Sequence, residues 1–111
     1  MNEGQKFDQD KVRLDLYPVE ALWETSEVLT FGAKKYGDRN WEKGLAYSRC
    51  YGAALRHLAA WWSSIDNDPE TGLSHLAHAH CCIAFLQTFT QRGAGVDDRP
   101  LNKLVEETCQ D

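Results

Sequence analysis

The sequence predicts an all-α protein: a small bundle of about three long helices with a short C-terminal helix, completed by oligomerisation. Apolar residues recur with helical spacing over three segments, and no segment alternates apolar and polar residues for the length of a strand. The chain has 111 residues, of which 42% are hydrophobic, so it can form one domain with a modest core. Because three helices of this size make a thin bundle, we expect two or more chains to pack together and complete the core.

The first long helix is expected over about residues 18–35. Proline suits the first turn of a helix, where its missing N–H has no helical partner, and Gly37 suits the cap that ends the helix. A loop over residues 38–46 follows. The apolar positions of this helix fit a 3.6-residue period loosely: Val19, Leu22, Trp23, Val28, Leu29 and Phe31.

The second and third helices are expected over about residues 47–65 and 71–91, with a turn at residues 66–72 between them. The second helix has one apolar stripe, widened by Trp61 and Ile65: Tyr51, Ala54, Leu55, Leu58 and Trp62. The core side of the third helix is predicted as Leu73, Leu76, Ala77, Ile83, Ala84 and Leu86. Some large side chains should remain outside and mediate self-association: Trp23, Trp61, Trp62 and Phe85.

Residues 1–94 are predicted to form the all-α domain, and residues 95–111 an acidic tail or docking helix after the Gly93-Ala94-Gly95 linker. The net charge of −5 disfavours binding to a nucleic acid polymer, which needs a basic face. No apolar run approaches the ~20 residues of a membrane span, and the polar N-terminus does not read as a signal peptide. We therefore expect a soluble, cytoplasmic protein. The cysteines, none in a CxxC pattern, are expected to be reduced thiols: Cys50, Cys81, Cys82 and Cys109.

Two groups of carboxylates could hold a cation. Glu20, Glu24 and Glu27 lie at i, i+4 and i+7, so they share one face of the first helix. Like charges placed in this way repel by ~0.2–0.5 kcal/mol per pair, so the face is either solvated or partnered by a cation. Asp66, Asp68 and Glu70 lie in the turn before the third helix, where they serve turn chemistry or act as ligands of a hard cation.

Histidines are concentrated between His57 and His80. His75, His78 and Cys82 follow each other at i, i+3 and i+7 and point to one side of the third helix. Two histidines one turn apart can hold a metal ion, and imidazole favours Mn, Fe, Zn or Ni over Mg. The alternative is that these side chains are polar surface or hydrogen-bonded core histidines.

The basic residues are few, so their placement along the chain is informative. Lys34 and Lys35 end the first helix, and Arg56 lies among apolar neighbours, where partial burial would require an anionic partner. Tyr36 and Trp41 could stack on a base, or they could anchor the loop. The chain has no P-loop motif, no GxGxxG and no serine in a nucleophile elbow.

Several strings of this sequence resemble those of the phage dATP/dGTP diphosphohydrolase family, which is related to the MazG-like all-α nucleoside triphosphate pyrophosphohydrolases. The resemblance covers about residues 4–90. It rests on Lys11-x-Arg13-x-Asp15-Leu16-x-Pro18, on Phe31-Gly32-Ala33-Lys34-Lys35-Tyr36-Gly37-Asp38-x-Asn40-Trp41-x-x-Gly44, on Arg56-His57-Leu58-x-Ala60-Trp61, and on Asp66-x-Asp68-Pro69-Glu70-x-Gly72-Leu73-x-His75-Leu76-Ala77-His78-Ala79.

The resemblance implies hydrolysis between the α and β phosphates of a purine deoxynucleoside triphosphate, giving the monophosphate and pyrophosphate. It implies a divalent metal, Mg or Mn, a dimer or tetramer of helical bundles, and a role in phage nucleotide-pool control that extends to 2-aminoadenine DNA. The usual metal signature of the MazG-like relatives is ExxE followed by ExxD on the next helix. Here Glu24-x-x-Glu27 is present and no ExxD follows at that distance, while His75-x-x-His78 occupies a comparable helical position.

These considerations give the following expected site. The metal ligands would come from Glu20, Glu24, Glu27, His57, Asp68, Glu70, His75 and His78. Glu24 or Glu70 would accept the proton of the attacking water. The substrate-binding side chains would be Lys11, Arg13, Lys34, Lys35, Tyr36, Asn40, Trp41 and Arg56. Two alternatives remain: a pyrophosphohydrolase for another nucleotide, such as dUTP or dCTP, and a non-enzymatic helical interaction module.

Overall fold

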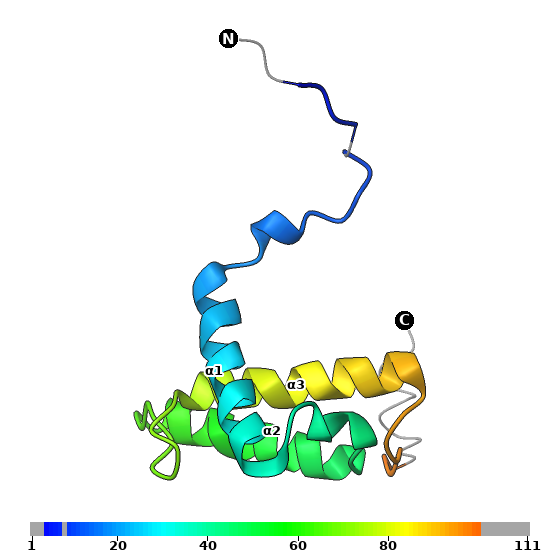
Figure 1. Cartoon of the computed structure of the whole chain (residues 1–111). Helices are drawn as coiled ribbons and strands as arrows, with labels where there is room; N and C mark the ends of the chain where they lie inside the picture. Colours follow the sequence, from blue (N-terminus) through cyan, green and yellow to red (C-terminus); the bar gives the residue numbers. More distant parts are fainter. Residues whose placement is uncertain (1–3, 8, 101–111) are drawn as a thin grey trace, which may run out of the picture.

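The computed structural model describes residues 4–7 and 9–100, and within them the protein is all-α, as predicted (Figure 1). No strand occurs in the described part of the chain. The elements are the 3-10 helix η1 (Leu14–Leu16), α1 (Val19–Tyr36), the 3-10 helix η2 (Asn40–Lys43), α2 (Tyr47–Trp62) and α3 (His75–Arg92). The predicted short C-terminal helix, and Cys109 with it, lie outside the described residues.

The ends of the helices follow from capping residues. Gly37, at φ +97°, ends α1 in a conformation that side chains disfavour, and its N–H donates to the carbonyl of Ala33. Helix α3 begins at His75, later than the predicted residue 71, because the Ser74 hydroxyl accepts the N–H groups of the first turn. Gly93 ends α3 in the left-handed conformation.

Helices α2 and α3 pack against each other as an antiparallel hairpin (Figure 1). The centre of their interface is a cluster of the buried side chains Tyr47, Cys50 and Phe89. The surrounding side chains that pack on this cluster are partly buried: Trp41, Cys82, Phe85, Leu86 and Ala94. Phe85, one of four large side chains of which some were expected on the surface, is partly buried against this cluster and stacks on Trp41.

The predicted apolar stripe of α2 is not its buried face. Ala54 is buried, but the other members are exposed: Tyr51, Leu55, Leu58 and Trp62. The face that α2 turns to α3 instead carries Tyr47, Cys50, Ala54 and His57. The prediction for α3 was also wrong at Leu76 and Ile83, which are exposed. The helical period correctly identified an apolar face of α2. It did not reveal that α3 packs against the adjacent, less apolar face of the same helix.

Helix α1 crosses α3 (Figure 1). It is connected to the rest of the chain near both ends, through a hydrogen bond between Tyr17 and His80 and an ion pair between Lys35 and Glu70. Its large apolar side chains remain exposed, and the one buried residue of α1 is Thr25. The exposed residues include Val19, Leu22, Trp23, Leu29 and Phe31. The described part of one chain therefore leaves most of the apolar surface of α1 unpartnered.

The chain after α3 returns to the start of α2. The carbonyl of Val96 accepts the N–H of Tyr47, and the carboxylate of Asp98 accepts both the N–H and the hydroxyl of Ser48. Asp98 thus occupies the positive end of the α2 dipole. The predicted boundary after residue 94 falls inside this contact. None of the helices in the described residues is long and apolar enough to cross a membrane.

Candidate metal centre

The candidate site continues the α2–α3 interface at the end nearest the connecting loop. Successive residues on the inner face of α3 are His75, His78, Cys82, Phe85 and Phe89, at intervals of three or four residues. The predicted common direction of the first three is confirmed by their contacts with α2. The α2–α3 interface is thus aromatic and apolar near the end of α3, and it becomes polar where α3 begins.

His57 of α2 meets two of the three histidines of α3, His75 and His78. Its Nδ1 atom lies 2.9 Å from Nδ1 of His75, and its ring stacks on that of His78 with 4.6 Å between centroids and 10° between planes. His75 is 6% exposed. Two ring nitrogens in contact require one donor and one acceptor, so at most one of these two Nδ1 atoms carries a proton when no cation lies between them.

Asp68 brings a carboxylate to the histidines from the loop. Ligand atoms of His57, Asp68 and His75 all lie within 4.8 Å of one another, and this is the group of potential metal ligands found in the described residues. We call these three residues the metal-ligand cluster. Together they present two imidazoles and one carboxylate, a donor set that protein metal sites use.

The loop holds Asp68 in place through its own backbone. One carboxylate oxygen, Oδ1, accepts the N–H groups of Glu70 at 2.9 Å and Thr71 at 3.0 Å. The backbone of Asp68 is also bonded to Leu73 and to Gly72, whose φ of +73° favours glycine. Because these contacts use Oδ1, Oδ2 is the oxygen through which Asp68 can reach a cation.

Thr71 supports the third histidine. Its hydroxyl lies 2.8 Å from Nε2 of His78 and accepts the N–H of Leu73 at 3.1 Å. It also lies 3.4 Å from Oδ1 of Asp68, so its single proton is donated either to that carboxylate or to His78, and the ring of His78 lies between Thr71 and His57. The sequence analysis did not single out Thr71; the signal was the Asp-x-x-Thr spacing of a hydrogen-bonded turn.

The protonation states favour metal binding. Burial, followed by the neighbouring histidines, lowers the pKa of His57, and burial also lowers the pKa of His78. Burial opposes ionisation of Asp68, but hydrogen bonds from the backbone of Thr71 and Glu70 outweigh it, so the pKa of Asp68 lies below its usual value. Neutral imidazole and ionised carboxylate are the forms that coordinate cations.

Glu70 and Lys35 lie beside the cluster without joining it. The ammonium group of Lys35 is 3.4 Å from Oε1 of Glu70, and both side chains are exposed. Hydrogen bonding to Tyr36, and then to Glu70, raises the pKa of Lys35. Lys34 is exposed on the same turn of α1. The structure thus brings together the end of α1 and the loop that carries Asp68.

The carboxylates of α1 are not part of the metal-ligand cluster. Glu20, Glu24 and Glu27 are exposed, and no described ion pair holds any of them. Within one chain, their helical spacing therefore does not coincide with the histidine site.

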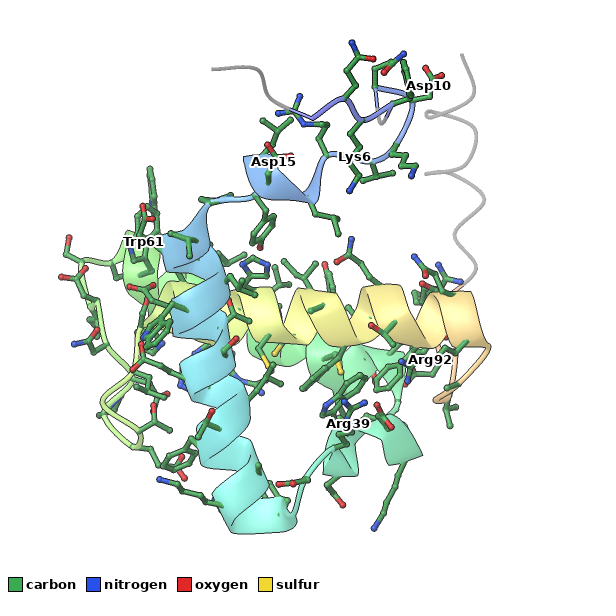
Figure 2. The ribbon with its side chains drawn as sticks, turned by 45° about the horizontal axis from the view of Figure 1, so that its top comes forward. Lys6, Asp10, Asp15, Arg39, Trp61 and Arg92 are labelled. Atoms are coloured by element: carbon green, nitrogen blue, oxygen red, sulfur yellow. The ribbon has the colours of Figure 1, made fainter. Side chains whose placement is uncertain are left out.

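The two predicted base-stacking residues lie apart: Tyr36 ends α1, with its ring 5.2 Å from the ammonium group of Lys35, whereas Trp41 lies at the opposite end of α3. Trp41 stacks on Phe85 at 4.8 Å between centroids, and the guanidinium of Arg92 lies 5.8 Å from its ring. Asn40 precedes Trp41 in η2. Figure 2 shows Arg39 and Arg92 at this end, and Trp61 near the other. Trp41 is thus packed against the core, which corresponds to the alternative that this side chain anchors the loop.

Two further basic residues lie away from the cluster. Lys11 and Arg13 belong to the exposed segment that leads away from the helices (Figure 1), where Arg13 pairs with Asp15 at 2.7 Å. Arg56, which was expected to be partly buried, is exposed. It immediately precedes His57, and neighbouring residues of an α-helix point about 100° apart, so the two side chains leave α2 in different directions.

Comparison with known proteins agrees with the resemblance. A family model described as dATP/dGTP diphosphohydrolase, N-terminal, matches residues 1–99. The dATP/dGTP diphosphohydrolase of Salmonella phage PMBT28 is 40% identical over 102 residues, which make up 92% of this chain and 35% of the phage protein. The chain thus spans about a third of the length of that curated relative, and no solved structure matches it significantly. The chain belongs to the dATP/dGTP diphosphohydrolase family.

Proposed function

We propose that this chain carries the metal centre of an enzyme that hydrolyses dATP or dGTP to the monophosphate and pyrophosphate. The observation that carries the proposal is the convergence of His57, Asp68 and His75 in a member of this family. The substrate class follows from the name of the phage relative. Control of a phage nucleotide pool, including one that supports 2-aminoadenine DNA, is the cellular role that this activity would serve.

The donor set fits a transition metal better than Mg. Mg prefers an octahedral shell of oxygens, whereas two imidazoles and a carboxylate suit Mn, Fe or Zn. The 2.9 Å between the Nδ1 atoms of His57 and His75 is close to the separation of two neighbouring ligands at ~2.1 Å from one ion. We therefore propose Mn ahead of Mg. When bound, such an ion neutralises phosphate charge and lowers the pKa of an attacking water.

The residues around the cluster have separable roles in this proposal. Asp68 supplies the one negative ligand and is positioned by the backbone of its loop. His78 stacks on His57 and fixes its orientation, while Thr71 fixes His78. These contacts keep the ligand atoms converged before substrate arrives, which reduces the cost of ordering them.

Glu70 and Lys35 form the pair that would act on the substrate. Glu70 is two residues from Asp68 and exposed, so its carboxylate can accept a proton from a water at the centre. Lys35 would exchange its ion pair with Glu70 for a phosphate oxygen, a charge-assisted contact, with Lys34 beside it. We place proton transfer on Glu70 rather than Glu24, because Glu70 is attached to the loop that bears Asp68.

A second copy of the chain belongs to the proposal. Trp23 is 71% exposed on α1, and Trp62 is 80% exposed on α2. The α2 stripe of Tyr51, Leu55, Leu58 and Trp62 repeats at intervals of four, three and four residues, the spacing of a helix that packs on another helix. Solvent exposure of such stripes is unfavourable, and a homodimer or homotetramer would bury them.

Product analysis tests the proposal. The purified chain is incubated with each deoxynucleoside triphosphate and either Mn or Mg, and nucleotides and phosphates are separated. We expect monophosphate and pyrophosphate from dATP or dGTP, with Mn more effective than Mg. Turnover of dUTP or dCTP alone would favour the alternative substrate class. Metal binding without turnover of any nucleotide would contradict the proposed hydrolysis by this chain while keeping the metal centre.

A further inference from the structure

Most arginines in the described part of this chain are held by carboxylates. The described structure pairs four of the six: Arg13 with Asp15, Arg39 and Arg92 with Glu42, and Arg99 with Asp97. Arg49 and Arg56 have no ion-pair partner among the described residues, although the chain has more acidic than basic residues.

These two arginines lie together. Seven residues apart on α2, they share one face of the helix, and with Ser48 they line a hollow of about 400 Å³. The guanidinium of Arg56 turns back toward Gly52, whose added Cβ would lie 3.3 Å from Nη1. Glycine is a poor helix former, but at this position the absence of a side chain leaves space for the guanidinium.

An acidic group that contacts the lining of the hollow is already engaged. Asp98 is bonded to the N–H and hydroxyl of Ser48, and these bonds lower the pKa of Asp98. It stabilises the start of α2 and forms no ion pair with Arg49 or Arg56. The two guanidinium groups repel each other in one hollow unless an anion lies between them. Since Asp98 does not serve as that anion, Arg49 and Arg56 can bind one from solution.

We propose that the hollow of Ser48, Arg49 and Arg56 binds an oligophosphate anion without a metal ion. Guanidinium groups suit phosphate oxygens in particular. A net charge of −5 repels a long polyanion, whereas a compact pyrophosphate or triphosphate group needs only this local positive charge. The residues that line the hollow include no member of the metal-ligand cluster. The inference therefore does not depend on the proposed hydrolysis.

The test is calorimetric titration of the full chain with tripolyphosphate and with dGTP, in the presence of EDTA. We expect saturable binding that is weakened at least about tenfold in the double variant Arg49→Gln/Arg56→Gln. The matched control is Arg39→Gln/Arg99→Gln, which removes the same charge from two exposed, paired arginines and should bind as the unaltered protein does. Equal affinity for the two ligands would identify the phosphates as the recognised group, and tighter binding of dGTP would add a contribution from the nucleoside.

Gly52→Ala separates binding from stability. The added methyl group presses on the guanidinium of Arg56 and improves helix propensity, so anion binding should weaken severalfold while the melting temperature rises or holds. A His75→Gln variant should keep the EDTA-resistant binding, which distinguishes this site from the metal centre. The proposal is overturned if the unaltered chain shows no saturable binding at millimolar ligand, if the Arg49/Arg56 variant binds normally, or if the control loses as much.

Discussion

Replacing Asp68 by Asn should abolish stabilisation by metal while leaving the fold nearly intact. The asparagine side-chain oxygen can still accept the N–H groups of Glu70 and Thr71, so the loop keeps its hydrogen bonds. The cluster, however, loses its one negative ligand. By contrast, Asp68→Ala leaves two backbone N–H groups without that acceptor, which should cost ~1–3 kcal/mol of stability even without metal.

The size of the effect can be stated in advance. Saturation at 100 times the dissociation constant stabilises a folded protein by ~2.7 kcal/mol. For a domain of about 100 residues this raises the melting temperature by roughly 10–20 °C. We therefore expect that rise when MnCl₂ is added to the unaltered chain, and little or none for Asp68→Asn.

Differential scanning calorimetry with and without MnCl₂ measures this directly, and Asp66→Asn is the matched control. Asp66 lies in the same loop and carries the same charge. In the described structure its backbone carbonyl accepts the N–H of His75, a bond that the substitution of the side chain does not remove. This control should keep the full metal effect. If Asp68→Asn keeps it too, or if Asp66→Asn loses it, the assignment of Asp68 as a ligand is refuted.

Three other predictions follow from the packing. Burial raises the pKa of Cys81 to about 12 and that of Cys82 to about 11, so both thiols should resist alkylation at pH 8 in the native protein, as measured by mass spectrometry of labelled peptides. Because the unfolded thiols ionise near pH 8.5, their stabilising contribution is complete below that pH and is lost as pH rises toward 11–12; a melting temperature that does not fall on this alkaline side would contradict it. Thr71→Val should lower stability by ~1 kcal/mol and Thr71→Ser should restore it, because the hydroxyl serves His78 and the loop; equal melting temperatures would refute this. Light scattering should show an oligomer that Trp62→Glu shifts toward monomer, and a species of 12.6 kDa for the unaltered chain at micromolar concentration would be the contrary result.

The helices themselves could be predicted from sequence because their signals are local. Gly37 ends α1, and the stretch around Asp68 breaks the chain between α2 and α3. The start of α3 was placed too early, since the capping role of Ser74 competes with a turn that also contains helix-forming residues. Local propensity therefore fixes the number of helices better than their first residues.

Which helix faces are buried could not be read from periodicity. Helix α2 has two candidate faces, the more apolar one containing Leu55 and Leu58, and the one containing Tyr47 and Cys50. The second packs on α3, and the first is left exposed. An amphipathic pattern states that a face prefers burial, but not whether the same chain or another copy supplies the partner.

The residues of the metal-ligand cluster could not be identified from their spacing in the sequence either. His57, Asp68 and His75 were all candidates, yet nothing in their separation along the chain distinguishes them from Glu20 or Glu27. Their convergence depends on the antiparallel packing of α2 on α3 and on a loop closed by its own backbone. These are tertiary contacts, which spacing within one helix does not report.

The most direct measurement of the central claim is phosphorus NMR of the products formed from dATP or dGTP with Mn, for the unaltered chain and for His75→Gln. The account predicts pyrophosphate and the nucleoside monophosphate as the initial products, and loss of that turnover in the variant at unchanged helical content. Release of orthophosphate as the first product, or undiminished turnover in His75→Gln, would contradict it.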